Sequence, residues 1–296
     1  MAHYARGWNQ RYTKLAPGPF TGKIIQASTA GMQLGLVTWG TSLLVTGAVP
    51  AGGRSFGLLA APGHSARLSG RVLANGTVAT RSDKDELYFI SEPDARMVVL
   101  TIEHQTLDRA LGMMFGADWH KIGGSAAVLR VRDPAALQAS LRGKLAAMLR
   151  HPEHLANPAL AAQIEEELFL TLFSRLDLPV EEVHPAERLR LARRADEYLR
   201  EHSWRPVSIA ELCAAIGARE RTLHVACREH LGLPPGAYLR VLRLHGARRD
   251  LRELGQATTV TDTATRWGFF HFGEFAAAYR RLFGEPPSQT ARAGAR

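Results

Sequence analysis

Two stretches near the C-terminus carry side chains suited to recognition rather than to making or breaking bonds. In each, basic, polar and small residues recur at the spacing of one helical face. Guanidinium groups bind phosphates and guanine, histidine and glutamate can reach base edges, and small apolar groups contact the thymine methyl. These residue types predict a surface for double-stranded DNA. The candidate DNA-binding residues are Arg219, Glu220, Arg221, Thr222, His224, Val225 and Arg228 in the first stretch, and His271, Phe272, Gly273, Glu274, Ala277, Arg280 and Arg281 in the second.

Motifs for catalysis are weak in this sequence. The segment 18–23 (GPFTGK) is one residue short of a phosphate-binding loop and lacks Ser or Thr after its lysine, so we predict a turn. His151 and His154 form a possible metal pair, but the intervening proline and the predicted loop argue against it. The paired His-x-His pattern of metal-binding jelly rolls is missing, and three further histidines are isolated: His64, His104 and His120. We therefore expect no enzyme, no metal and no cofactor.

The two cysteines, Cys213 and Cys227, fall on the predicted core faces of two neighbouring helices. Two cysteines in 296 residues exclude a disulfide-stapled scaffold and a cysteine-rich zinc domain. Buried structural thiols are the preferred interpretation. A redox switch is the alternative, because the two side chains would be near neighbours in a helical hairpin.

Both DNA-binding stretches belong to an internal repeat that pairs residues 208–235 with residues 259–287. Each copy consists of a short helix, a glycine break and a second helix that ends at Gly and Pro-Pro. A sharp glycine turn between short helices is the helix-turn-helix plan. A plain helical hairpin would explain one copy, but two copies in a basic segment favour DNA binding. The matched positions include Ile209 with Val260, Gly217 with Gly268, Leu223 with Phe275, Cys227 with Tyr279 and Gly232 with Gly284.

The connector between the copies predicts one long helix over residues 235–254, with an apolar stripe at Leu244, Ala247, Leu251 and Leu254. A helix of that length is roughly 30 Å long. One turn of B-DNA is about 34 Å long. A rigid connector can therefore place two recognition helices in successive major grooves.

The positive charge is concentrated in the same part of the chain. The formal net charge is +9; residues 1–183 contribute 18 basic and 16 acidic side chains, and residues 184–296 contribute 19 arginines, no lysine and 12 acidic side chains. The net charges are therefore +2 and +7. A basic domain beside a nearly neutral one indicates a polyanionic partner, although an arginine-rich proteome is the alternative explanation.

Residues 20–102 read as short strands with few helix signals, which predicts a β sandwich or small barrel of the jelly-roll or cupin-like kind. Asn75-Gly76 is a two-residue hairpin signal. The uncharged stretch 24–53 is interrupted by glycines and polar residues, so we expect buried strands rather than a membrane span. The expected strands are 23–27, 32–39, 43–48, 55–60, 66–73, 77–80, 86–90 and 97–102.

Two helices are expected after the strands, at 134–150 and 158–176. The pair could cover the barrel or form a dimer seam, and we slightly prefer the seam although covering a sheet is commoner. Residues 177–185 (DLPVEEVHP) contain two prolines and no period, which suggests a linker. The N-terminus has no apolar signal segment, so we expect a cytoplasmic protein.

Residues 188–292 resemble the AraC/XylS transcription regulators, whose DNA-binding domain consists of two helix-turn-helix units joined by a long helix. The resemblance rests on Gly268-Phe269, Phe275 and the run from Tyr279 to Pro287 (YRRLFGEPP). The sequence looks most like the branch that contains the ethanolamine-utilisation regulator. The resemblance implies an effector-sensing or dimerising module in residues 1–180.

The second recognition helix departs from many members of that family, which place Ser, Gln, Thr or Arg where this chain has Ala276 and Ala277. We therefore expect the first unit to carry most of the base readout and Arg280 and Arg281 to contact phosphates.

The sequence as a whole predicts an α+β protein of two domains. Residues 1–183 form a β-rich sensing or dimerising module that includes the helical pair 134–176, and residues 184–296 form the tandem helix-turn-helix domain. The predicted function is sequence-specific transcription regulation. The expected partners are double-stranded DNA, RNA polymerase and an unknown small-molecule effector, with a possible homodimer. The alternatives are a cupin-like enzyme with a DNA-binding tail and an effector-independent DNA-binding protein.

Overall fold

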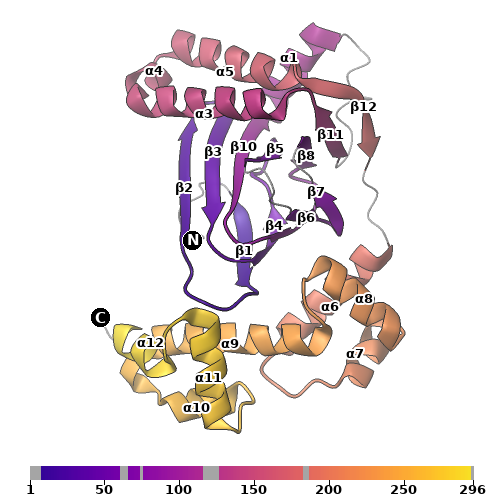
Figure 1. The fold of residues 1–296 in the computed structure, drawn as a ribbon, viewed down its shortest axis with the longest axis vertical. Coiled ribbons are helices and arrows are strands. Elements are labelled where there is room, and N and C mark those ends of the chain that lie inside the picture. The colour runs from indigo at the N-terminus through magenta and orange to yellow at the C-terminus, as the bar shows by residue number, and fades with distance from the viewer. Residues whose placement is uncertain (1–7, 61–65, 74–75, 116–126, 183–186, 295–296) are drawn as a thin grey trace.

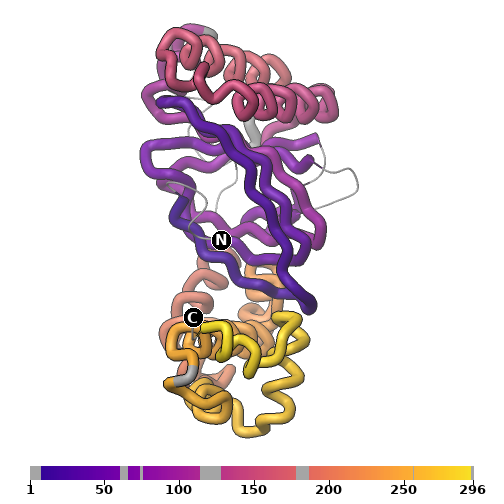
Figure 2. The backbone as a smooth tube through the Cα atoms, turned by 90° about the vertical axis from the view of Figure 1, so that its left-hand side faces the viewer, coloured from indigo at the N-terminus to yellow at the C-terminus, as the bar shows by residue number. Residues whose placement is uncertain are grey.

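The computed structural model describes residues 8–60, 66–73, 76–115, 127–182 and 187–294. Three tiers are stacked along the long axis (Figure 1): helices at one end, two β-sheets in the middle and a second group of helices at the other end. Figure 2 shows the same order after a quarter turn. Within the described ranges, no helix is both long and apolar enough to cross a membrane.

Two antiparallel sheets form the middle tier. The five-stranded sheet has the order β1-β4-β9-β6-β7, and the seven-stranded sheet has the order β12-β11-β8-β5-β10-β3-β2. The bounds are β1 Asn9–Lys14, β2 Gly22–Ser28, β3 Met32–Trp39, β4 Leu43–Ala48, β5 Gly53–Leu59, β6 Ala66–Leu68, β7 Arg71–Leu73, β8 Thr77–Ser82, β9 Leu87–Ser91, β10 Ala95–Glu103, β11 Ala127–Val131 and β12 Leu176–Glu182.

The seven-stranded sheet packs on both faces, which accounts for the uncharged stretch 24–53. Leu34, on one face, joins a core with the helices. Trp39, on the other face, joins a second core with Leu43 and Phe89 of the five-stranded sheet. Strands buried on both sides need continuous apolar sequence rather than strict alternation. The predicted strands 32–39 and 43–48 are confirmed to the residue as β3 and β4.

The Asn75-Gly76 hairpin prediction is wrong. β7 and β8 flank this pair, but β7 belongs to the five-stranded sheet and β8 to the seven-stranded sheet, so the chain crosses between sheets here. Asn75 itself lies outside the described residues. The single strand expected over 66–73 is also wrong, because Ser69 (φ 50°) and Gly70 (φ 81°) turn the chain back and make β6 and β7 a hairpin.

The first group of helices covers the seven-stranded sheet (Figure 2). Leu137, Leu141 and Leu145 of α3 share one core with Leu168 and Leu172 of α5 and with the sheet. The apolar stripes therefore cover the sheet, which was the less favoured of the two alternatives. A dimer contact through the remaining exposed face stays a prediction. These helices are α1 His104–Phe115, α3 Pro134–Arg150, α4 Pro152–Ala156 and α5 Pro158–Phe173.

The linker predicted over 177–185 is largely a strand. Residues 176–182 form β12, which pairs with β11 at the edge of the seven-stranded sheet. An edge strand tolerates Pro179 because one of its sides needs no hydrogen-bond donor. Residues 183–185 lie outside the described part of the chain.

The second group of helices forms the C-terminal tier, and its connector α9 spans Pro235–Leu254 as predicted. Two cores lie along α9: Tyr238 and Leu242 join one, and Ala247 and Leu251 join the other. The helices are α6 Glu187–Glu201, α7 Ile209–Ile216, α8 Glu220–His230, α9, a 3₁₀ turn Gly255–Ala257, α10 Val260–Arg266, α11 Phe272–Phe283 and α12 Pro287–Gly294.

Strand β1 and its following turn dock the sheets onto the C-terminal tier. Lys14 Nζ donates to the carbonyls of Gly18 and Leu282, and the amide of Gly18 donates to the carbonyl of Arg281 at 2.8 Å. The predicted turn at 18–23 therefore contacts the end of α11. Leu44 and Tyr88 of the small sheet also join the core of α6–α9.

A buried polar network lies beside this interface. The Asp196 carboxylate accepts from the hydroxyl of Tyr238 at 2.6 Å and pairs with Arg200 Nε at 2.6 Å. Arg200 Nη2 also donates to the Tyr238 hydroxyl at 2.7 Å and to Thr13 Oγ1 of β1 at 3.2 Å. Burial, reinforced by the Asp196 charge, raises the pKa of Tyr238 well above 10.

Removal of the Asp196 carboxylate should therefore be costly. We expect Asp196→Ala to lower the free energy of unfolding by about 3–5 kcal/mol, because the buried Tyr238 and the partly buried Arg200 lose their shared acceptor. Glu197→Ala removes an exposed carboxylate from the next position on α6 and should cost less than about 1 kcal/mol. Chemical denaturation of both variants measures the difference, and similar losses of stability in the two would contradict the assignment.

Candidate nucleic-acid interface

The first helix-turn-helix unit consists of α7, a turn and α8. Ser208 accepts from the amide of Glu211 and caps the start of α7, and Gly217 ends it in the left-handed region (φ 64°, ψ 42°). Leu212 and Leu223, from the two helices, are fully buried in one core. Their packing fixes the crossing of the helices and turns the opposite face of α8 outward.

The predicted contact residues of this unit lie at the start of α8 and on its outer face. Arg219, Glu220, Arg221, Thr222 and Arg228 are exposed, whereas His224 and Val225 are half-buried. His224 lies on the flank of the outer face, 3.8 Å from the Glu220 carboxylate, with 32% of its side chain exposed. The structure therefore exposes all three arginines and leaves His224 half-buried beside Glu220.

The second unit repeats the plan with α10 and α11. Thr259 caps α10 through the amide of Asp262, and Gly268 (φ 75°) makes the turn. Phe275 and Tyr279 hold α11 in a core of aromatic rings. The predicted residues of this unit are all exposed: His271, Phe272, Gly273, Glu274, Ala277, Arg280 and Arg281.

An exposed aromatic residue of the second turn was missed from the sequence. Phe270 has 69% of its surface exposed, more than the neighbouring Phe272 at 45%. The signal was the second of two phenylalanines after Gly268: Phe269 turns into the core and Phe270 turns out. An apolar side chain on this surface can pack against sugar or thymine methyl groups.

The arginines of the C-terminal tier divide into two groups. Several brace the scaffold through carboxylates: Arg188 with Glu229, Arg200 with Asp196, Arg205 with Glu211, Arg248 with Glu285 and Arg266 with Asp250. In contrast, ten exposed arginines form no side-chain hydrogen bond or ion pair with any described residue. Five of them belong to the predicted contact set: Arg219, Arg221, Arg228, Arg280 and Arg281. The other five are Arg190, Arg194, Arg240, Arg252 and Arg292. The five of the contact set lie on the two recognition helices or directly before the first of them. Their free guanidinium groups are available to phosphates and base edges.

One of the bracing pairs holds the first unit in place. Arg205 Nη2 donates to Glu211 Oε1 at 2.6 Å, and the hydroxyl of Tyr198 donates to the same oxygen at 2.7 Å. The hydrogen bonds from Arg205 and Tyr198 lower the pKa of Glu211 to about 2. Glu211 therefore stays ionised at neutral pH and ties the start of α7 to α6.

The two cysteines are free thiols in the first unit. Cys227 is fully buried and Cys213 is half-buried. Burial raises the pKa of Cys227 to about 12 and also raises the pKa of Cys213. Because the thiolate is the reactive form, a raised pKa at each cysteine favours structural thiols over a redox switch.

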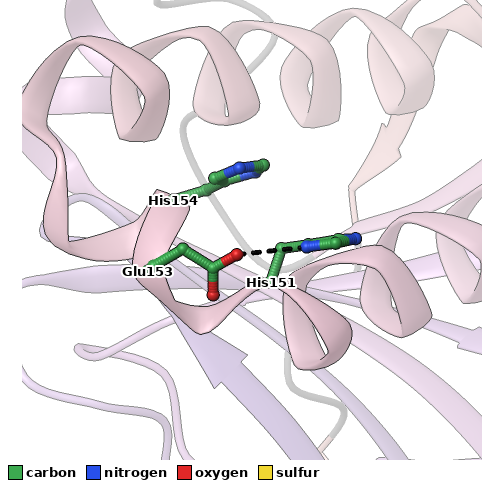
Figure 3. A group of neighbouring side chains, drawn as sticks. All are labelled: His151, Glu153 and His154. Carbon is green, nitrogen blue, oxygen red and sulfur yellow. Dashed lines mark hydrogen bonds and ion pairs between the residues drawn. The ribbon is translucent and has the colours of Figure 1, made fainter.

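The two histidines of the possible metal pair do meet, with Glu153 as a third group (Figure 3). His151 Nδ1 lies 3.1 Å from a Glu153 oxygen, and the rings of His151 and His154 stack with centroids 5.1 Å apart. All three are exposed on the short helix α4 and the residue before it. Ring stacking and one ion pair account for this arrangement, and we assign it no metal.

The remaining histidines of the sequence prediction are placed differently. His104 pairs with the Asp83 carboxylate at 2.9 Å, and this hydrogen bond holds the pKa of Asp83 well below its usual range. His64 and His120 lie outside the described residues.

These features together define a class: two helix-turn-helix units on one connecting helix, with unpaired arginines on both recognition helices. Residues 212–293 match a family model described as a helix-turn-helix domain. Over 103 residues the chain is 37% identical to the probable thc operon regulatory protein of Rhodococcus erythropolis, covering 34% of this chain and 31% of that protein. Over 100 residues it is 34% identical to XylDLEGF operon transcriptional activator 1 of Pseudomonas putida, covering 33% and 30%.

A solved structure of a probable AraC family transcriptional regulator from Rhodopseudomonas palustris CGA009 is 36% identical over 35% of this chain and 97% of that chain, with a TM-score of 0.34. The aligned region spans less than a third of the length of the two curated relatives. The sequence matches support the AraC/XylS family through the C-terminal domain.

The unpaired arginines lead to a direct test of the first recognition helix. We expect Arg221→Ala to weaken binding and to reduce discrimination against a substituted base pair by about 1–3 kcal/mol, because alanine cannot replace a bidentate guanidinium at a base edge. Arg142→Ala removes the same charge from exposed α3 at the other end of the molecule (Figure 1) and should change neither. Competition binding measures both, and an unchanged preference for Arg221→Ala would place the base contacts elsewhere.

Proposed function

We propose that this chain is a sequence-specific transcription regulator of the AraC/XylS type, in which residues 184–296 bind double-stranded DNA and residues 1–183 respond to a small-molecule effector. The observation that carries the proposal is the set of five unpaired, exposed arginines on the two recognition helices. Unpaired guanidinium groups on a helical surface are suited to the phosphates and guanines of one duplex face.

The connector supports binding to one face of the duplex. α9 has 20 residues, which makes it about 30 Å long. Cores at its two ends hold α8 and α11 on the same rod. The length is close to one turn of B-DNA, about 34 Å, so the recognition helices can enter successive major grooves. Arg280 and Arg281 would then contact phosphates and the first unit would read most of the bases.

The effector would bind between the two sheets, which we interpret as a jelly-roll or cupin-like module. An apolar cavity lies there, lined by residues of both sheets, including Val45 and Phe89 of the small sheet and Val37 and Met97 of the large one. Concave apolar cavities with a few polar groups are the usual sites for small ligands. The contact of β1 with α11 gives such a ligand a route to the DNA-binding tier.

The branch, location and partners of the protein are inferred from its resemblance to the AraC/XylS regulators. We infer a place in the branch of the ethanolamine-utilisation regulator, a cytoplasmic location, RNA polymerase as a partner and a homodimer. The two alternatives predict different observations. A cupin-like enzyme with a DNA-binding tail would hold a tightly bound metal after purification, and an effector-independent binder would show the same DNA affinity with every metabolite.

The function is tested by selecting DNA sites from a random pool with the full chain and footprinting the sites obtained. We expect protection of two segments about 10 base pairs apart on one face. The affinity should fall steeply between about 50 and 200 mM salt, because phosphate contacts release counterions.

A variant of the recognition helices tests whether the salt dependence of DNA binding arises from the proposed surface. Replacing Arg219, Arg228, Arg280 and Arg281 together by alanine should make the slope of log affinity against log salt shallower by about 0.9 for each phosphate that is no longer neutralised. The control replaces four exposed arginines of the N-terminal module: Arg67, Arg96, Arg130 and Arg142. Equal slopes in wild type and the recognition-helix variant would reject the proposed surface.

A further inference from the structure

One arginine of the N-terminal module is buried without a carboxylate partner. Arg81 on β8 has only 7% of its surface exposed. Its Nη2 donates to Ser69 Oγ at 2.8 Å, whereas its Nε has no hydrogen-bond partner. Burial lowers the pKa of Arg81, and the negative charge of Asp85 partly opposes this shift. A guanidinium this deep in a protein is costly unless an anion joins it.

Arg81 lines the apolar cavity between the sheets. Among the described residues around that cavity it is the single charged side chain, and its neighbours are mostly aliphatic or aromatic. Trp39 also lines the cavity, is 5% exposed, and has an indole Nε1–H without an acceptor. Two buried donors thus lack acceptors at the wall of one cavity. Buried polar groups are nearly always paired, so this cavity is short of an acceptor.

The volume of the cavity limits the size of the ligand that could supply the missing acceptor. The space measures about 100 Å³. This is smaller than the apolar cavity of about 150 Å³ that accommodates benzene in another protein, so the ligand must be smaller than a six-membered ring. A ligand for this space therefore has a compact apolar body and a single anionic group. A carboxylate fits this description best, because its two oxygens match the paired donors of a guanidinium.

Arg81 is also connected to the first recognition helix. Its partner Ser69 lies with Gly70 in the turn between β6 and β7, where both have positive φ. The backbone of Gly70 is packed so closely on the ring of His230 that a Cβ there would collide with it. His230 is 3% exposed and is the last residue of α8. The cavity and α8 are therefore separated by one hydrogen bond and one tight turn.

We propose that the cavity binds a compact apolar carboxylate through Arg81 and that the bound acid acts on α8 through the Ser69–Gly70 turn. The carboxylate takes the free donors of Arg81 and draws the guanidinium away from Ser69. The turn then shifts against His230 and changes the position of α8. The effect of the acid on DNA binding rests on the proposed function. The binding of the acid to the cavity does not depend on that function.

The ligand class is tested by calorimetry on the full chain with propionate, butyrate and isobutyrate, each compared with its neutral amide. At least one acid should bind, and its amide should bind at least about tenfold more weakly, because the amide cannot form a hydrogen bond between charged groups. Arg81→Met should reduce the acid affinity by at least about tenfold. Arg67→Met removes the same charge from an exposed position on β6 and should leave the affinity unchanged.

Three outcomes overturn the assigned ligand class. They are equal binding of an acid and its amide, full acid affinity in Arg81→Met, and no binding of any of the three acids to the wild-type chain. Thermal unfolding without ligand separates a structural role from a binding role. Arg81→Met should unfold at or above the wild-type temperature, since it removes a buried unpaired charge. A clear decrease would make Arg81 a structural cation and would also overturn the proposal.

The route to α8 is tested separately by hydrogen exchange. Adding the bound acid should change the exchange of the amides of 220–230 in the wild-type chain. Ser69→Ala should still bind the acid but should no longer show this change. An unaltered response in Ser69→Ala, or no response in the wild type, overturns the route. DNA affinity is measured in parallel, and a failure to bind DNA with intact acid binding would reject the proposed function while leaving the ligand assignment in place.

Discussion

The packing of α9 is the constraint on which the DNA-binding tier depends. Tyr238 near its start is buried against α6 and α8, and Leu251 near its end is buried against the second unit. Each recognition helix is positioned by its own small core, and α9 belongs to both. A helix has few soft degrees of freedom along its axis, so the separation of the two units is set by the number of residues between these cores. The surface that faces DNA is therefore a property of the connector as much as of the recognition helices.

The same helix also contacts the sheets, which gives the molecule one continuous chain of packing. His245 Nε2 on α9 lies 3.3 Å from the carbonyl oxygen of Lys14, and Arg200 of α6 reaches both Tyr238 and Thr13. β1 thus lies between the cavity and the connector. Tyr12 lines the cavity, and the next two residues on β1 touch the helices. Because side chains alternate along a strand, Tyr12 and Thr13 face opposite sides, and the long side chain of Lys14 at the end of β1 extends to the carbonyl of Leu282.

The sequence was most informative where local signals decide the structure. α9 and β3 begin and end as predicted, since Pro-Pro, glycine and turn residues mark their limits. β1 and β12 were missed because they are edge strands: their polar sequences pair on one side only, and that pairing depends on residues far away in the chain. The candidate DNA surface was largely predictable, because helical spacing separates Leu223 from Arg221. The cavity was not predictable from the sequence, because its lining comes from strands of two sheets that lie far apart in the chain.

Unpaired arginine has opposite consequences in the two halves of this protein. On α8 and α11 the free guanidinium groups are exposed, so water satisfies them and their charge is available to a polyanion at little cost to folding. Arg81 has the same free donors but lies under the surface, where water cannot satisfy them and the charge opposes folding. An exposed free arginine is thus consistent with a partner that binds and leaves. A buried one stores an unfavourable free energy that only an enclosed anion relieves, and that difference allows ligand binding to move the turn beside it.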